Sequence, residues 1–284
     1  MICPVCDGTG WKMVERDGVR SATRCDCWRD QLASRLAADA RIPRRYQHCD
    51  LGNCRAYNES LSRARARAVK LAEAFPVVDR GLFLEGPPGA GKTHLAVAVL
   101  RQVVATRGAR GLYYDTRDLL RVIRSTYDPV VRTTEIEVLR PVMTAELLVL
   151  DDLGAEKTSE WVEETLSLIV NTRYNERRPT IFTSNYEAQP DDTDPNSLLC
   201  RIGFRMYSRL HEMCEFVALD AADYRDEGAQ YSDEDLVAMW KMKRQGRKGR
   251  VAAVRPAPAR AQLPDSKADL KWPGGRAGSR TWAC

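Results

Sequence analysis

The sequence of 284 residues lacks any long hydrophobic run, and this absence limits what the chain can be. No apolar stretch approaches the roughly 20 residues with which a helix spans a bilayer. No signal peptide precedes Cys3 either, so we expect a soluble, cytoplasmic protein with no membrane partner. In that reducing compartment, the nine cysteines indicate metal ligation or free thiols rather than disulfides.

The chain also has little net charge, +5, but this value hides an asymmetry. Residues 241–284 contain twelve lysines and arginines against two aspartates. The rest of the chain therefore has 32 basic and 37 acidic residues, a net charge of −5. Beyond a helical pattern at 233–242 the basic segment shows no periodicity. We predict that residues 231–284 form a short helix followed by a disordered basic tail.

One stretch, residues 81–100, contains a phosphate-binding pattern. An apolar run at 82–84 predicts a buried strand, a turn rich in Gly and Pro follows, and Lys92 begins an apolar helix. This strand–loop–helix order is the context that the G-x-x-x-x-G-K-[ST] pattern requires. Glycines let backbone N–H groups face phosphates, Lys92 can reach the β- and γ-phosphates, and the Thr93 hydroxyl can ligate Mg²⁺. We predict a nucleoside triphosphate site formed by Gly86, Pro87, Pro88, Gly89, Ala90, Gly91, Lys92, Thr93 and His94.

Polar residues follow two further predicted strands. The apolar run at 147–150 ends at Asp151 and Asp152, and a strand at 180–183 is followed by Ser184 and Asn185. Open α/β sheets place their ligands at the carboxyl ends of their strands. We predict that Asp151 holds Mg²⁺ and that Asp152 orients or activates the attacking water. Asn185 would hydrogen-bond this water or the γ-phosphate, and the alternative for Asn185 is turn formation.

The remaining patterns complete an α/β fold with a parallel sheet flanked by helices. Two more short apolar runs predict strands at 111–114 and 216–219. Helices are predicted at 28–40, 58–75, 135–145, 161–174 and 197–211, and another begins at 116. The helix from 116 has Arg117, Arg121 and Arg124 between its apolar positions. These arginines and the basic tail could contact DNA phosphates, and the alternative is a solvated helix face.

Two pairs of cysteines lie within the first 27 residues, Cys3 with Cys6 and Cys25 with Cys27. The first pair has the C-x-x-C spacing and the second the tighter C-x-C spacing. Four thiolates would complete a tetrahedral Zn²⁺ site and leave no open position for a substrate, so we predict a structural zinc site. A set of buried or redox thiols is the alternative. We interpret three residues further along the chain as packing residues rather than ligands: His48, Cys49 and Cys54.

Four segments in order, GPPGAGKTHLA, LLVLDDLGAE, TIFTSN and RIGFRMYSRL, resemble the AAA+ ATPases of the DnaC and DnaI type. These are replicative helicase loaders within the IstB-like ATP-binding superfamily. With IPRRYQHCDL at the domain entry, the resemblance spans about residues 42–225. CPVCDGTGW and CDC resemble the zinc-binding N-terminal region of the DnaI branch, which docks on the helicase. The implied organisation is a zinc-binding region at 1–40, an AAA+ ATPase domain at 41–230 and the basic segment at 231–284.

The resemblance implies an ATP-driven switch with Mg²⁺ that oligomerises in the ATP state, grips single-stranded DNA and places a ring-shaped replicative helicase on it. It implies Walker A roles for Lys92 and Thr93, Walker B roles for Asp151 and Asp152, and a sensor-1 role for Asn185. Many AAA+ proteins have Glu in place of Asp152, which predicts slow or partner-stimulated hydrolysis.

The resemblance also implies roles for three arginines. Arg209 matches the arginine finger that reaches a neighbouring subunit's ATP, and Arg205 is a second candidate. Arg225 matches a sensor-2 arginine, but little chain follows the last strand to form the helical lid that usually carries it. Two other functions compete with helicase loading. They are an IstB-like helper of DNA transposition, and an adaptor for DNA or protein that uses ATP for assembly with little turnover.

Overall fold

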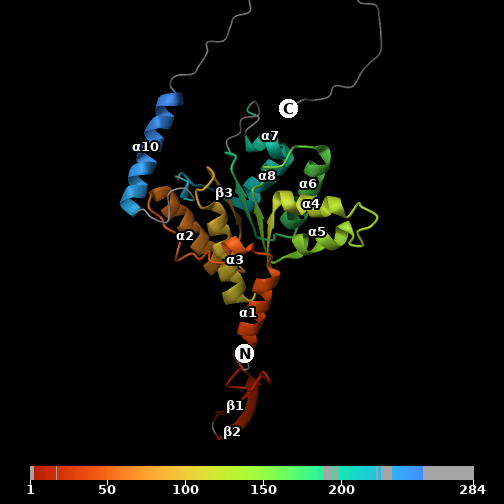
Figure 1. The fold of residues 1–284 in the computed structure, drawn as a ribbon. Coiled ribbons are helices and arrows are strands. Elements are labelled where there is room, and N and C mark those ends of the chain that lie inside the picture. The colour runs from red at the N-terminus through yellow and green to blue at the C-terminus, as the bar shows by residue number, and fades with distance from the viewer. Residues whose placement is uncertain are drawn as a thin grey trace, which may run out of the picture.

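The structure is a computed structural model that describes residues 3–16, 18–188, 194, 197–221, 223–224 and 232–251. At its centre is a five-stranded parallel sheet with the strand order β4-β5-β6-β3-β7 (Figure 1). The strands are β3 (Gly81–Glu85), β4 (Gly111–Asp115), β5 (Leu147–Asp151), β6 (Thr180–Ser184) and β7 (Cys214–Ala218). They confirm the predicted α/β fold. Because β3 lies between β6 and β7, the loop after β3 is beside the end of β6.

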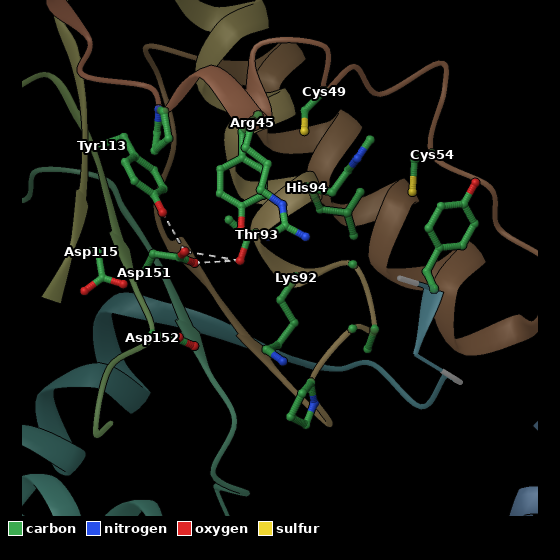
Figure 2. Close-up of a pocket in the computed structure, with 18 of the residues that line it drawn as sticks. Arg45, Cys49, Cys54, Lys92, Thr93, His94, Tyr113, Asp115, Asp151 and Asp152 are labelled. Atoms are coloured by element: carbon green, nitrogen blue, oxygen red, sulfur yellow. Dashed lines mark hydrogen bonds between the residues drawn. The ribbon is translucent and has the colours of Figure 1, made fainter. Parts of the chain in front are cut away.

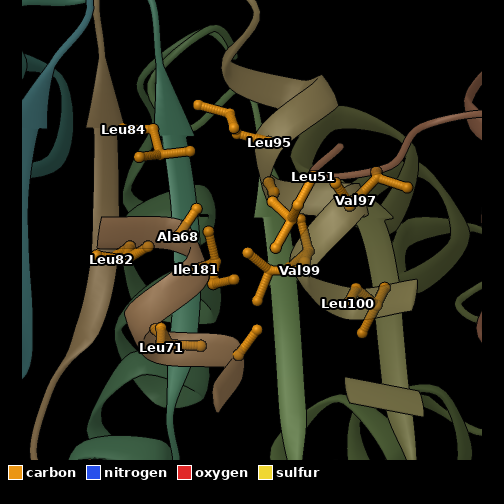
Figure 3. Close-up of a cluster of buried hydrophobic side chains, with 14 of the residues drawn as sticks. Leu51, Ala68, Leu71, Leu82, Leu84, Leu95, Val97, Val99, Leu100 and Ile181 are labelled. Carbon is orange, nitrogen blue, oxygen red and sulfur yellow. The ribbon is translucent and has the colours of Figure 1, made fainter. Parts of the chain in front are cut away.

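Alternate residues of the central strands enter two hydrophobic layers, as expected of strands buried on both faces. Leu82 and Leu84 pack in the layer that contains α2 (Glu59–Ala74) and α3 (Lys92–Arg107) (Figure 3). Phe83 packs in the opposite layer and stacks on Phe216, with ring centroids 4.5 Å apart. The helices of that layer are α4 (Thr116–Ser125), α5 (Glu135–Thr144), α6 (Glu160–Asn175), α7 (Leu198–Ile202) and α8 (Phe204–Met213).

A charged residue of α6, Arg173, is the largest of the fully buried side chains. Its guanidinium donates hydrogen bonds to the carbonyl oxygens of Val142, Ala145 and Pro179 at 2.9, 2.9 and 2.7 Å. Its Nε atom donates to Thr180 Oγ1 at 2.7 Å. The last carbonyl groups of a helix have no partner within that helix. Arg173 therefore satisfies the end of α5 and joins it to the start of β6.

The N-terminal residues form an antiparallel hairpin that the sequence analysis did not predict. It consists of β1 (Trp11–Arg16) and β2 (Val19–Arg24). All six residues of β2 are exposed, so this strand has no buried face from which a pattern could be recognised. Helix α1 (Cys27–Asp39) connects the hairpin to the rest of the chain, and Figure 1 shows the hairpin at the end of α1 that is farther from the sheet.

Two predicted helices differ from the structure. The helix predicted at 197–211 is interrupted at Gly203, whose φ of 76° and ψ of 155° separate α7 from α8. The helix predicted at 233–242 continues as α10 (Asp233–Val251), so the first part of the predicted tail is helical. Lys, Arg, Gln and Met favour helix in this stretch in spite of its two glycines. Residues 252–284 lie outside the described part. Among the described helices, α10 included, none has the length and apolarity to cross a membrane.

Candidate nucleotide-binding and zinc sites

The loop between β3 and α3 is a tight cradle that two of its glycines make possible. Gly86 and Gly89 have positive φ values of 142° and 77°. A Cβ atom at Gly86 would lie 2.1 Å from the Leu219 carbonyl oxygen, and one at Gly89 would lie 1.8 Å from Asp223 Oδ1. A side chain cannot be accommodated at such distances. The segment after β7 therefore packs directly on this loop and fixes its shape.

Lys92, the first residue of α3, points back into the loop and is buried. Its Nζ atom donates to the carbonyl oxygens of Gly86 and Pro87 at 2.8 and 2.9 Å. It also donates to Asn185 Oδ1 at 2.7 Å. These are neutral acceptors, and phosphate oxygens are stronger partners for an ammonium group. Lys92 is therefore placed to exchange acceptors when a phosphate chain enters the loop.

Asp151, the last residue of β5, is buried and accepts hydrogen bonds from three hydroxyl groups, of which Figure 2 shows those of Thr93 and Tyr113. Thr93 Oγ1 lies 3.0 Å and Thr183 Oγ1 lies 2.6 Å from its Oδ1, and the Tyr113 hydroxyl lies 2.7 Å from its Oδ2. Burial raises the pKa of Asp151, although these hydrogen bonds act in the opposite direction. Hydroxyl and carboxylate oxygens are ligands that Mg²⁺ prefers. Thr93 and Asp151 thus fit the predicted magnesium site.

The next residue, Asp152, has a left-handed backbone with a φ of 58° and is held from two sides. Its backbone N–H donates to Thr183 Oγ1 at 2.9 Å, and its Oδ1 accepts from Asn185 Nδ2 at 2.8 Å. Arg117 Nη2, from the start of α4, lies 3.7 Å from its Oδ2. Asn185 therefore joins Lys92 to Asp152, and the structure brings together the four residues predicted from separate segments: Lys92, Asp151, Asp152 and Asn185.

Sequence reasoning missed two residues of this site, Tyr113 and Thr183, and it missed the contact that Arg117 makes with Asp152. Tyr113 lies near the end of β4 and Thr183 near the end of β6, the two strands that flank β5. Polar residues near the ends of neighbouring strands are a signal that could have found them, but the strand order was needed to say which strands are neighbours. Burial and the nearby Asp151 charge raise the pKa of Tyr113, so its hydroxyl acts as a hydrogen-bond donor.

A pocket of about 970 Å³ opens beside these residues, within the size range of small-molecule sites. Its walls include the loop from Pro88 to Gly91, the start of α3 and much of the segment that leads into α2. His94, which was predicted to contact the nucleotide, lines the pocket, and burial lowers its pKa. Tyr224 also lines the pocket, and its backbone N–H donates to the Gly89 carbonyl oxygen at 3.1 Å.

The arginines predicted to reach ATP are not part of this pocket in their own chain. Arg205 and Arg209 lie on α8, where Arg209 Nη1 donates to the Arg205 carbonyl oxygen at 3.1 Å. Neither residue lines the pocket that holds Lys92. Arg225 lies outside the described residues, so its predicted role stays a prediction.

The four N-terminal cysteines converge as the zinc prediction requires. Cys3 Sγ lies 3.8 Å from Cys25 Sγ, and Cys6 Sγ lies 3.4 Å from Cys27 Sγ. All four sulfur atoms are within 4.8 Å of one another. Burial raises the pKa of the Cys6 thiol, but backbone and thiol hydrogen bonds together lower it to about 7. Four convergent thiols with one readily ionised member match the donor set of a closed zinc site.

Residues 39–230 match the model of one family, described as IstB-like ATP binding protein. The chain belongs to this family. Membership implies ATP with Mg²⁺ as the ligand of the site, and it confirms the resemblance found in the sequence.

Similar proteins with curated names include helicase loaders. The replicative helicase loader DnaC of Escherichia coli K12 is 28% identical over 140 residues, which are 49% of this chain and 56% of DnaC. The replicative helicase loader DnaI of Bacillus subtilis 168 is 27% identical over 150 residues, 52% of this chain and 46% of DnaI. The chain thus spans about half the length of these curated relatives.

Solved structures support the same fold. A crystal structure of the DnaC helicase loader is 35% identical, has a TM-score of 0.56, and covers 62% of this chain and 99% of its own. AMPPCP-bound DnaA from Aquifex aeolicus is 18% identical, has a TM-score of 0.55, and covers 75% of this chain and 67% of its own. Because the identity is low, this likeness concerns the fold alone. This IstB-like protein therefore has the P-loop AAA+ core that its sequence predicted.

Proposed function

We propose that this IstB-like protein is an ATPase that uses ATP hydrolysis to load a ring-shaped replicative helicase onto single-stranded DNA. The observation that carries the proposal is the linked set at the carboxyl edge of the sheet, in which Asn185 bonds both Lys92 and Asp152. The similarity of the chain to the helicase loaders DnaC and DnaI supports helicase loading as the use of this ATPase site. A role at the replication fork also places the protein in the cytoplasm.

Each residue of the edge has a distinct part in hydrolysis. Lys92 binds the phosphate chain, and Thr93 with Asp151 would hold Mg²⁺, which neutralises phosphate charge when bound. Asp152 accepts a proton from, or orients, the attacking water. The Asn185 side-chain amide donates a hydrogen bond of 2.8 Å to Asp152 and so fixes that carboxylate, and it can sense the γ-phosphate through Lys92. Because an aspartate is one methylene shorter than a glutamate, we expect slow turnover that a partner stimulates.

Single-stranded DNA is proposed to bind along α4. Arg117, Arg121 and Arg124 are exposed and follow the four- and three-residue spacing of one helix face. Arg124 stacks on Trp161 at 4.7 Å from the ring centroid, which gives an aromatic surface beside the positive charge. Since Arg117 also contacts Asp152, DNA bound on this face would act directly on the carboxylate that handles water. The basic segment from 241 would add a nucleotide-independent attraction to DNA.

The N-terminal region, residues 1–40, is proposed as the part that docks on the helicase. Val5, Trp11, Met13 and Val19 are large apolar side chains in this region and all are exposed. Such residues are typical of a surface that a protein partner covers. The four cysteines would hold Zn²⁺ and fix the shape of this surface. The ATPase domain is proposed at 41–230, with the basic segment 231–284 after it.

Two other functions have specific support. The family model that matches is named for IstB, so a helper role in DNA transposition is the second candidate. An adaptor with little turnover is the third, because Asp152 replaces the commoner glutamate. Copurification with a replicative helicase separates the first function from the second. Single-turnover hydrolysis in the presence of DNA separates the first function from the third.

Arg209 provides the test of the ATPase. It does not line the nucleotide pocket of its own chain, and we propose that it acts on the ATP of a neighbouring subunit in a homo-oligomer. Arg209→Ala should keep ATP affinity and lose DNA-stimulated turnover, by a factor on the order of 10³ for a finger of the usual strength. Mixing Arg209→Ala with Lys92→Ala should restore part of the turnover through composite sites. Arg205→Ala tests the second candidate on the same helix: loss of turnover in Arg205→Ala instead of Arg209→Ala would make Arg205 the finger. Normal hydrolysis by Arg209→Ala would remove this assignment.

A further inference from the structure

A second group of metal-ligand side chains lies in the wall of the nucleotide pocket, away from the four N-terminal cysteines. It consists of His48, Cys49 and His94, each of which offers one ligand atom, and these atoms lie within 4.8 Å of one another. All three residues line the pocket. We propose that His48, Cys49 and His94 form a second Zn²⁺ site, with a fourth position open to the pocket.

The group is formed by two segments that are distant in sequence. His48 and Cys49 follow the short helix η1 (Arg44–Tyr46), and His94 is in the first turn of α3, two residues after Lys92. The two imidazole rings meet edge to face with centroids 6.2 Å apart. Figure 2 shows Cys49 above His94 on the same side of the pocket. The packing of the entry segment, which contains His48 and Cys49, on α3 therefore brings the three side chains together. No local sequence motif does so.

The sequence analysis interpreted His48, Cys49 and Cys54 as packing residues. Cys49 is indeed part of the hydrophobic core, with 1% of its surface exposed. The third member of the group is nevertheless His94, and Cys54 is not in it. Nothing in the sequence joins His94 to the other two, because more than forty residues separate them.

His94 has the support that a ligating histidine usually has. Its Nε2 atom lies 3.1 Å from the Asp50 carbonyl oxygen. When Nε2–H donates this bond, Nδ1 keeps its lone pair. A metal-bound histidine commonly donates its other N–H to a backbone carbonyl, which fixes the tautomer and the ring orientation. Asp50 belongs to the same loop as His48 and Cys49, so the loop both supplies ligands and orients the third.

The types of ligand atom in this group indicate which metal ion it would bind. Two imidazoles and one thiol suit Zn²⁺, whereas Mg²⁺ prefers carboxylate and water oxygens, so the proposed site does not duplicate the Thr93–Asp151 site. Zinc bonds of about 2.0 Å to nitrogen and 2.3 Å to sulfur place tetrahedral ligand atoms roughly 3.3–3.6 Å apart. The group has to contract by no more than about 1.5 Å, and His48, which is exposed, can supply that movement. A bound ion would tie the entry segment to the helix that follows the phosphate loop.

The test is metal binding by the full chain, with Zn²⁺ and then Co²⁺ as probes. We expect two zinc ions per chain after equilibration, and one for His48→Ala or His94→Ala. Cys54→Ala, a change in the same loop, and His211→Ala, a change of the remaining histidine, are matched controls that should keep two ions. His48→Ala alters an exposed side chain, so its effect is not a consequence of misfolding.

Cobalt absorption separates the two sites. In a chain with Cys3→Ser and Cys25→Ser, one Co²⁺ should still bind, with thiolate charge-transfer absorption weaker than that of a four-thiolate site. Adding Cys49→Ala should remove the charge-transfer absorption. The proposal is overturned if the double cysteine variant binds no metal. It is equally overturned if His48→Ala and His94→Ala both keep two zinc ions.

Discussion

The nucleotide site and the four-cysteine site are held in place by different means. At the nucleotide site, all residues of β5 and β6 are buried, and Asp151 already has three hydroxyl partners within the protein. At the cysteine site, most of the large apolar side chains are exposed. Among residues 3–26 that the structure describes, the buried side chains are those of Cys6 and Cys25. Hydrophobic burial supports the first site, and we propose that a bound metal ion supports the second.

Because of this difference, the stability of the core and the shape of the proposed docking region depend on different interactions within one chain. In the AAA+ core, buried strands and hydrogen bonds within the protein hold the nucleotide residues in place. The N-terminal region buries little apolar surface, so the proposed zinc ion would have to fix its shape. A chain built in this way can lose its proposed docking surface and still bind ATP.

The largest effect should come from removing zinc. Structural zinc contributes on the order of 10–16 kcal/mol to the folding of small zinc domains. In chelator, or with Cys25→Ser, we expect the amide protons of residues 11–24 to lose protection from hydrogen exchange. Those of 147–151 should keep it, and ATP affinity should be unchanged. Cys200→Ser, outside both metal groups, is the control. A hairpin that stays protected in chelator would contradict the comparison.

The next largest effect should be a loss of core stability from Arg173→Met. The change leaves the carbonyl groups of Val142, Ala145 and Pro179 buried without their donor. We expect the free energy of unfolding of the core to fall by about 3–5 kcal/mol, while zinc content is unchanged. Denaturant unfolding measures it, with the exposed Arg63→Met as control. A loss below about 1 kcal/mol would show that these carbonyl groups find other partners.

A smaller effect concerns pH. Burial raises the pKa of Asp151, so the folded state binds more protons than the unfolded state between the ordinary pKa and the raised one. Stability of the nucleotide-free chain should therefore fall as pH rises through this interval. The Asp151→Asn variant carries no charge at this position. It should therefore melt at a higher temperature than the intact chain at pH values above the interval, and at the same temperature below it. Asp118→Asn, at an exposed position, should show no such difference. An Asp151→Asn advantage that does not change with pH would contradict this explanation.

The parts of the fold that the sequence predicts are those with local signals. The run LLVL before Asp151 and the loop before Lys92 need no knowledge of their neighbours, and both agree with the structure. The partners Tyr113 and Thr183 depend on β4 and β6 lying on either side of β5, which no spacing reveals. The same holds for His94 beside Cys49. The hairpin at 11–24 escaped prediction because it has almost no buried face.

We propose that the ATP site and the four-cysteine region act together to place a helicase on DNA. The most direct measurement is recovery of the ring helicase of the same genome on closed circular single-stranded DNA, which has no ends for a ring to pass over. With ATP, the intact chain should load the helicase, Lys92→Ala should fail because it binds no phosphate chain, and Cys25→Ser should fail although it still hydrolyses ATP. If the intact chain hydrolyses ATP in this assay and no helicase is recovered on the circles, the account is contradicted.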